Sequence, residues 1–236
     1  MPDVGAGRGS GEVTVHRSGG RFLTRGEGIF TRHSFSYGGH YEPTNIGFGE
    51  LIAMNEETVE PGQGYEHHHH ADVEIVTWVL EGALLHEDTA GHRGVITPGL
   101  AQRLSAGDGV QHSERNASKV DELRFIQMML RSDNTGEPSY EQVEVPAGTG
   151  ELIPTVSVLQ HKAKLFLARL EPGQMIHVPA SAFSYVHVAA GTVSAAEHLL
   201  RAGDALRLSD AGAYDLSATA ASGGEPAEVL IWQMQR

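Results

Sequence analysis

Two short stretches of the sequence carry side chains that could bind one metal ion. The first contains the His-x-His pair His68 and His70, and the second contains the His-x-Glu pair His112 and Glu114. Residues two apart on a β-strand point to the same face, so each pair shares a face of its strand. Pairing the two strands would bring three imidazoles and one carboxylate together. This nitrogen and oxygen ligand set suits a redox-active divalent metal.

The histidine run at residues 67–70 also has simpler explanations. A run of four histidines can be an expression tag, but tags are placed at a terminus and this run lies between a turn and a strand. A single histidine is usually a surface residue with a satisfied ring. The occurrence of both motifs, each beside apolar strand sequence, favours the metal site.

Composition excludes several classes of function. The net charge of −13 argues against direct binding to nucleic acid and against docking on anionic membranes. The chain has no cysteine, which excludes disulfides, thiolate metal sites, iron–sulfur clusters and thiol nucleophiles. The hydrophobic fraction of 40% is ordinary for a globular protein.

The N-terminal residues bear on the expected cellular location of the protein. Residues 1–12 are polar and rich in glycine, without the apolar core of a signal peptide, and we expect them to be flexible. No apolar run approaches the roughly 20 residues that span a bilayer. We therefore expect a cytoplasmic protein.

Short apolar runs between turn signals predict an all-β fold of the sandwich or barrel type. The candidate strands are 13–16, 47–58, 74–80, 83–88, 94–96, 102–105, 122–130, 164–170, 184–189, 192–198, 205–208 and 228–234. The polar stretch at residues 132–154 is rich in Gly, Pro, Glu and Ser and indicates a linker. We expect residues 13–131 and 155–236 to be two domains.

A faint internal repeat supports two related domains. Residues 60–63 (EPGQ) recur as 171–174, 78–82 are echoed by 187–191, and 106–108 (AGD) return as 202–204. The offsets between these landmarks place Pro179, Ser181, Leu208 and Asp210 opposite His68, His70, His112 and Glu114. We therefore expect the second domain to lack the metal ligands.

These motifs resemble those of the cupin superfamily. The first cupin motif is matched by Gly62, His68, His70, Glu74 and Gly82, and the second by Gly109, His112 and Asn116. Gly107 stands where the second motif usually has proline. The resemblance implies two tandem jelly-roll β-barrels.

A closer resemblance is to the pirin family of bicupins. Its landmarks are similar to residues 28–36, 46–49, 59–62, 74–82, 109–114 and 138–142, and the C-terminal half is similar only in outline. His69 departs from the proline that the family often has between its two ligand histidines. This changes the stiffness of the backbone and not the ligands.

The resemblance implies one divalent transition metal, held in the N-terminal domain by His68, His70, His112 and Glu114. Iron(II) is the foremost expectation, with copper, nickel, cobalt and manganese as alternatives. Bacterial members are linked to quercetin 2,3-dioxygenase activity, in which molecular oxygen opens the flavonol ring and carbon monoxide is released. Glu114 would be both ligand and catalytic base. Strand parity also makes Glu74 a candidate ligand, but the resemblance favours Glu74 as a partner that orients a histidine.

Two other functions remain open. The eukaryotic relative is regarded as an iron-dependent nuclear co-regulator, so this chain could be a redox-sensing module that acts through a protein partner. A third alternative is an inert or storage-type cupin that keeps its ligands without turnover. The leading expectation is a dioxygenase whose partners are a flavonol and dioxygen.

Overall fold

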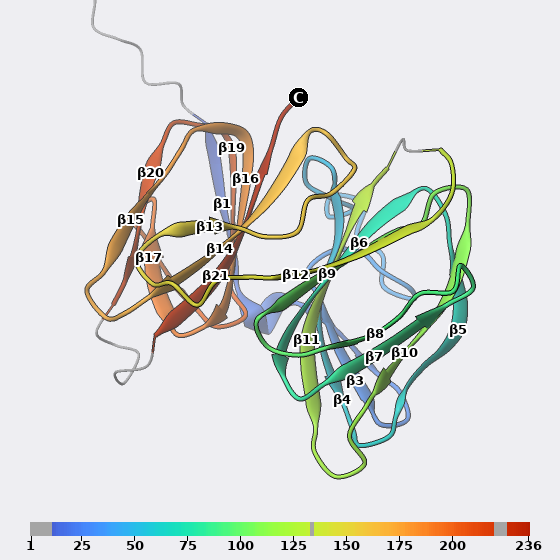
Figure 1. Ribbon diagram of the computed structural model, residues 1–236. Coiled ribbons are helices and arrows are strands. Elements are labelled where there is room, and N and C mark those ends of the chain that lie inside the picture. The colour runs from blue at the N-terminus through green and yellow to red at the C-terminus, as the bar shows by residue number, and fades with distance from the viewer. Residues whose placement is uncertain (1–10, 133–134, 220–225) are drawn as a thin grey trace, which may run out of the picture. The chain divides into compact units, whose positions relative to one another are not determined.

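The computed structural model describes residues 11–132, 135–219 and 226–236. Figure 1 shows that their regular secondary structure is almost entirely β-strand, as the sequence predicts. The described residues contain one helical element, the 3₁₀ helix η1 (Ser18–Gly20). None of the described helical segments has the length and apolarity to cross a bilayer. Residues 1–10 of the expected flexible N-terminus lie outside the described residues.

The N-terminal unit comprises residues 19–148 and 153–165 and contains two antiparallel sheets. The seven-stranded sheet has the order β12 (Ser139–Glu144), β9 (Leu100–Ser105), β6 (Val73–Glu81), β11 (Leu123–Arg131), β4 (Leu51–Val59), β3 (Ile29–His33), β2 (Phe22–Arg25). The four-stranded sheet has the order β5 (Gly64–His70), β10 (Val110–Asn116), β7 (Leu84–Asp88), β8 (Arg93–Ile96).

The C-terminal unit also contains two sheets, and its described residues are 11–18, 149–152 and most of 166–236. The six-stranded sheet has the order β1 (Glu12–His16), β19 (Ala205–Ala211), β16 (Ser181–Ala190), β21 (Ala227–Met234), β14 (Ala163–Leu170), β13 (Leu152–Pro154). The four-stranded sheet has the order β15 (Met175–Val178), β20 (Tyr214–Ala218), β17 (Thr192–Ala195), β18 (His198–Arg201).

The strand order confirms the internal repeat. The orders β9-β6-β11-β4 and β5-β10-β7-β8 recur as β19-β16-β21-β14 and β15-β20-β17-β18, ten strands later along the chain. Each unit is a double-sheet jelly roll of the cupin type, with two separate sheets and not one closed barrel. The expected pair of tandem cupin domains is therefore confirmed.

The contacts divide the chain differently from the expected domain boundaries. Strand β1, expected in the N-terminal domain, pairs with β19 of the C-terminal unit. Strand β12, expected in the linker, pairs with β9 over its whole length. Its sequence SYEQVE is polar because it is an edge strand without a fully buried face, so composition alone made it resemble a linker.

The interior of the N-terminal unit is interrupted by polar side chains. Along β4 the inward positions are Ala53, Asn55, Glu57 and Val59, all buried. Ala53 belongs to one apolar cluster and Val59 to another, so Asn55 and Glu57 lie between the two. Strand β11 repeats this pattern, with buried Gln127 between Met129 and Phe125. Since buried polar groups are costly without partners, this polar layer points to a function.

The C-terminal unit has a continuous apolar core instead. Its strand β15 contributes Ile176 and Val178 to this core, and β20 contributes Tyr214 and Leu216. These two strands take the places of β5 and β10 in the repeated order.

One detail of the predicted repeat is wrong: Leu208 and Asp210 lie in β19, the counterpart of β9, so they are not opposite His112 and Glu114. The third landmark pair is not equivalent, because residues 106–108 lie between β9 and β10 whereas residues 202–204 lie between β18 and β19, the counterparts of β8 and β9.

Candidate metal centre

The predicted metal-site strands are neighbours in the small sheet of the N-terminal unit. His112 on β10 pairs directly with His68 on β5. The register then shifts, so that Glu114 pairs with Tyr65. Gly64, at the start of β5, has a φ of 157°. A Cβ there would lie 2.3 Å from the carbonyl oxygen of Glu114, so glycine allows the strands to approach.

The three histidines of the predicted site converge. The ring of His112 lies 4.4 Å from that of His68 and 5.0 Å from that of His70, between centroids. One ligand atom from each of the three lies within 4.8 Å of the others. A second group, with the same spacing, joins His112 to Glu114 and His86. His112 therefore connects all four predicted ligands.

The protonation of the histidines suits metal binding. Burial is the main cause that lowers the pKa of His70 to about 4 and that of His112 to about 2, so both rings are neutral near pH 7. Nδ1 of His68 lies 2.9 Å from the carbonyl oxygen of Glu66, to which it donates. Nε2 of His68 is then the nitrogen with a lone pair.

Glu114 is buried among polar neighbours. Its Oε2 accepts a hydrogen bond of 2.6 Å from Nε2 of Gln127. Burial is the largest cause that raises the pKa of Glu114 to about 7, and the nearby Glu57 raises it further. The hydrogen bond from Gln127 acts in the opposite direction.

The residues present fit a metal ion. Among the described residues, Nε2 of His70, Nε2 of His112 and Oε1 of Glu114 are buried and have no hydrogen-bond partner. Each such atom costs about 1–3 kcal/mol, and these three differ from the other orphaned atoms because their residues belong to the two clusters of possible metal ligands. All three belong to the predicted ligand set. Three imidazoles and a carboxylate are also donors that divalent iron, nickel and copper accept.

His86 on β7 is a residue of this site that the sequence reasoning missed. Its Nε2 lies 3.2 Å from Oδ2 of Asp88, and its Nδ1 lies 3.4 Å from Nδ1 of His112. Because both of its nitrogens have partners, His86 is suited to support His112 and not to bind a metal itself. With Nε2–H donated to Asp88, Nδ1 of His86 accepts from His112, which leaves Nε2 of His112 without a proton. The His-x-Asp spacing of residues 86–88 is the signal that could have identified it.

Glu74 has a different role from the one expected. Its Oε1 accepts hydrogen bonds from Ser105 and Ser132, and its Oε2 accepts one from the backbone N–H of Leu159. None of the described hydrogen bonds joins Glu74 to a histidine. The parity argument fails because Glu74 lies on β6, in the other sheet, after a turn at Asp72 with a φ of 57°.

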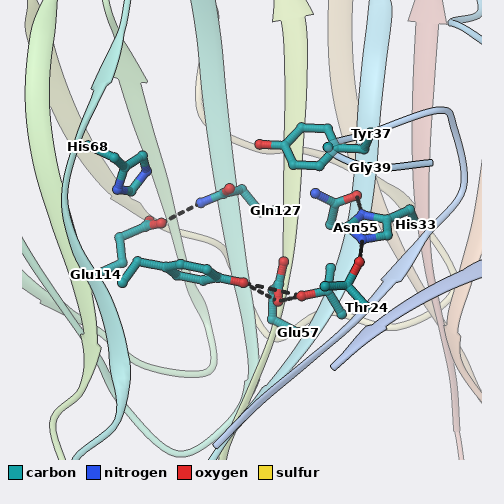
Figure 2. Close-up of a pocket in the computed structure, with 12 residues that line it drawn as sticks. Thr24, His33, Tyr37, Gly39, Asn55, Glu57, His68, Glu114 and Gln127 are labelled. Carbon is teal, nitrogen blue, oxygen red and sulfur yellow. Dashed lines mark hydrogen bonds between the residues drawn. The ribbon is translucent and has the colours of Figure 1, made fainter. Parts of the chain in front are cut away.

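A cavity of about 250 Å³ lies beside the candidate metal ligands in the N-terminal unit (Figure 2). His68 and Glu114 of the small sheet line one side. The large sheet lines the other side with polar side chains: Thr24, Thr31, His33, Asn55, Glu57 and Gln127. Tyr37 and Tyr65 add aromatic surface. A cavity with this lining can hold an aromatic molecule with several polar groups.

Comparisons with known proteins agree with this architecture. A family model described as Pirin matches residues 15–130, and one described as Quercetinase C-terminal cupin domain matches residues 155–233. A Mycobacterium bovis protein named "Putative quercetin 2,3-dioxygenase" is 42% identical, over 94% of this chain and 95% of its own length. A quercetin 2,3-dioxygenase of Escherichia coli K12 is 38% identical, over 50% of this chain and 52% of its own.

Solved structures show the same fold. The crystal structure of YhhW from Escherichia coli has a TM-score of 0.88 and 27% identity, covering 94% of this chain and 97% of its own. The structure of this bacterial pirin in complex with nickel(II) has a TM-score of 0.87 and 26% identity, covering 95% of this chain and 99% of its own. With the family match and the relatedness over nearly the whole length, the chain belongs to the pirin family of two-domain cupin proteins.

Proposed function

We propose that this protein is a metal-dependent dioxygenase that cleaves flavonols such as quercetin with dioxygen. The observation that carries the proposal is the cavity lined by His68 and Glu114, beside three buried ligand atoms without partners. The names of the relatives, quercetin 2,3-dioxygenases, support the substrate class.

His68, His70, His112 and Glu114 would hold one divalent transition metal. Iron(II) remains our first expectation, and the nickel(II) in the related bacterial pirin supports nickel as an alternative. A bound ion of this kind would lower the pKa of a coordinated hydroxyl, so that the reactive flavonolate forms near neutral pH.

Glu114 would accept the proton of the substrate hydroxyl. Its carboxylate lines the cavity that would hold the substrate, so it can take part in proton transfer there. Gln127 holds Oε2, so Oε1 is the atom left for the metal or the proton. The surrounding buried side chains of the cavity would orient the rings and exclude bulk water.

The test is turnover by metal-loaded protein. Purified protein with iron(II) should consume quercetin and dioxygen in equal amounts, followed by near-visible absorbance and an oxygen electrode. If the wild type consumes neither with iron, copper, nickel, cobalt or manganese, the dioxygenase proposal is wrong. The redox-sensing alternative, acting through a protein partner, would then lead.

A further inference from the structure

The wall of the cavity on the large sheet is built from two rows of paired polar residues. Cross-strand partners in an antiparallel sheet point to the same face. In the first row, Gln127 pairs with Asn55, and Asn55 pairs with His33. In the second row, Glu57 pairs with Thr31, and Thr31 pairs with Thr24. All six residues line the cavity.

Most polar atoms of this wall are already bonded to one another. Nδ1 of His33 lies 3.0 Å from Oδ1 of Asn55, and its Nε2 lies 2.8 Å from Oγ1 of Thr24. Oε2 of Glu57 accepts hydrogen bonds of 2.5 Å from Thr31 and 2.8 Å from Tyr65. These bonds fix the orientation of the Glu57 carboxyl group.

The other oxygen of Glu57 is left for a ligand. Figure 2 shows Oε2 at the dashed hydrogen bonds and the second oxygen directed into the cavity. Among the described residues, no hydrogen bond reaches that second oxygen. Glu57 is buried, with 4% of its surface exposed, but its second oxygen is not among the fully buried atoms without a partner, so molecules in the cavity can reach it. A hydrogen-bond donor in the cavity, from water or from a bound molecule, can satisfy this oxygen.

The charged groups that line the cavity indicate what charge a molecule bound beside Glu57 should carry. The described lining of the cavity contains two carboxyl groups, Glu57 and Glu114, and no lysine or arginine. The lining therefore offers no cationic side chain to pair with an anionic group beside Glu57, whereas a neutral hydroxyl there can donate to Glu57. Aromatic rings at Tyr37 and Tyr65 favour a flat ring system.

We propose that Glu57 is a specificity-determining residue that binds a second, phenolic hydroxyl of the substrate, separate from the oxygen that approaches the metal ligands. The inference rests on the proposed function and deepens it. The preferred substrates would be polyhydroxylated flavonols, and flavonols without hydroxyl groups on their outer rings would be poor ligands. A single hydrogen bond to a charged group is worth roughly 10- to 100-fold in affinity.

The test compares two ligands and two variants. Quercetin carries hydroxyls on its outer rings, and 3-hydroxyflavone has the same skeleton without them. The Kd of each is measured without oxygen, from the absorbance change on binding to metal-loaded protein. Glu57→Gln should reduce the preference for quercetin roughly 10- to 100-fold, with unchanged metal content. The matched control is Glu56→Gln, the next residue of β4, which bonds Arg21 instead of lining the cavity.

Two results would overturn the inference. One is wild-type protein without preference between the two flavonols, and the other is a preference that survives in Glu57→Gln. Because binding is measured without oxygen, the result is independent of turnover. Protein that binds quercetin selectively but never cleaves it would refute the proposed function while supporting the role of Glu57.

Discussion

At the scale of single residues, His112 is shared by both groups of candidate metal ligands. It is buried, and its pKa is lowered to about 2, chiefly by burial. Replacing it removes the side chain that joins the two groups, and it also removes the partner of Nδ1 of His86.

We expect His112→Ala to abolish binding of the metal, measured by elemental analysis of the purified protein. His177→Ala is the control, because His177 lies on β15, the counterpart of β5 in the C-terminal unit, and is exposed and bonded to Asp215. The His177→Ala variant should keep one equivalent of metal. A full equivalent of metal in His112→Ala would show that the metal binds at another site.

A second prediction concerns Glu114. Glu114→Gln keeps an oxygen ligand but loses the charge and the basic site. Metal affinity should fall roughly 10- to 100-fold or more. Turnover of a flavonol by metal-replete variant should fall by roughly 10²–10⁴, the usual contribution of a positioned base. Near-normal kcat in this variant would exclude Glu114 as the base.

At the scale of elements, strand parity predicted the convergence of β5 and β10 because the two strands are neighbours in one sheet and the register shift in β5 lies before His68. It failed for Glu74, since a turn at Asp72 sends β6 into the other sheet. It missed His86, since the sequence does not show that β7 lies beside β10. Strand parity predicts which residues share a face of one strand. It does not predict which other strands lie beside that strand.

The contribution of β7 can be tested with His86→Phe. Phenylalanine keeps the stacking on Tyr140, whose ring centroid lies 4.8 Å from that of His86, but removes both nitrogens. His112 then loses the acceptor that fixes its tautomer. Metal affinity, from competition with a coloured chelator, should fall roughly 10- to 100-fold. Glu87→Gln, on the same strand and paired with exposed Arg93, is the control. Equal affinity in wild type and His86→Phe would show that His86 has no role in the site.

At the scale of the whole molecule, the repeat and the all-β class were predictable because they depend on periodicity and turn residues spread along the chain. The domain boundaries were not, because the pairing of β1 with β19 joins residues far apart in the sequence. The placement in the cytoplasm stays a prediction.

The pH dependence of the free energy of unfolding should reflect the burial of Glu57. Its pKa is raised to about 7, chiefly by burial, above its usual 4.5. A carboxyl with a raised pKa contributes stability below pH 4.5 that is lost as the pH rises through 7. In metal-free protein, the free energy of unfolding of Glu57→Gln, relative to that of wild type, should therefore be higher at pH 8 than at pH 5. Urea unfolding at both pH values measures this, and an identical difference at both would contradict it.

The most direct test of the account is the release of carbon monoxide from quercetin. Metal-loaded wild-type protein should release one carbon monoxide for each quercetin and each dioxygen consumed, and His112→Ala should release none. Loss of quercetin without carbon monoxide, or equal release by His112→Ala, would contradict flavonol ring cleavage at this metal centre.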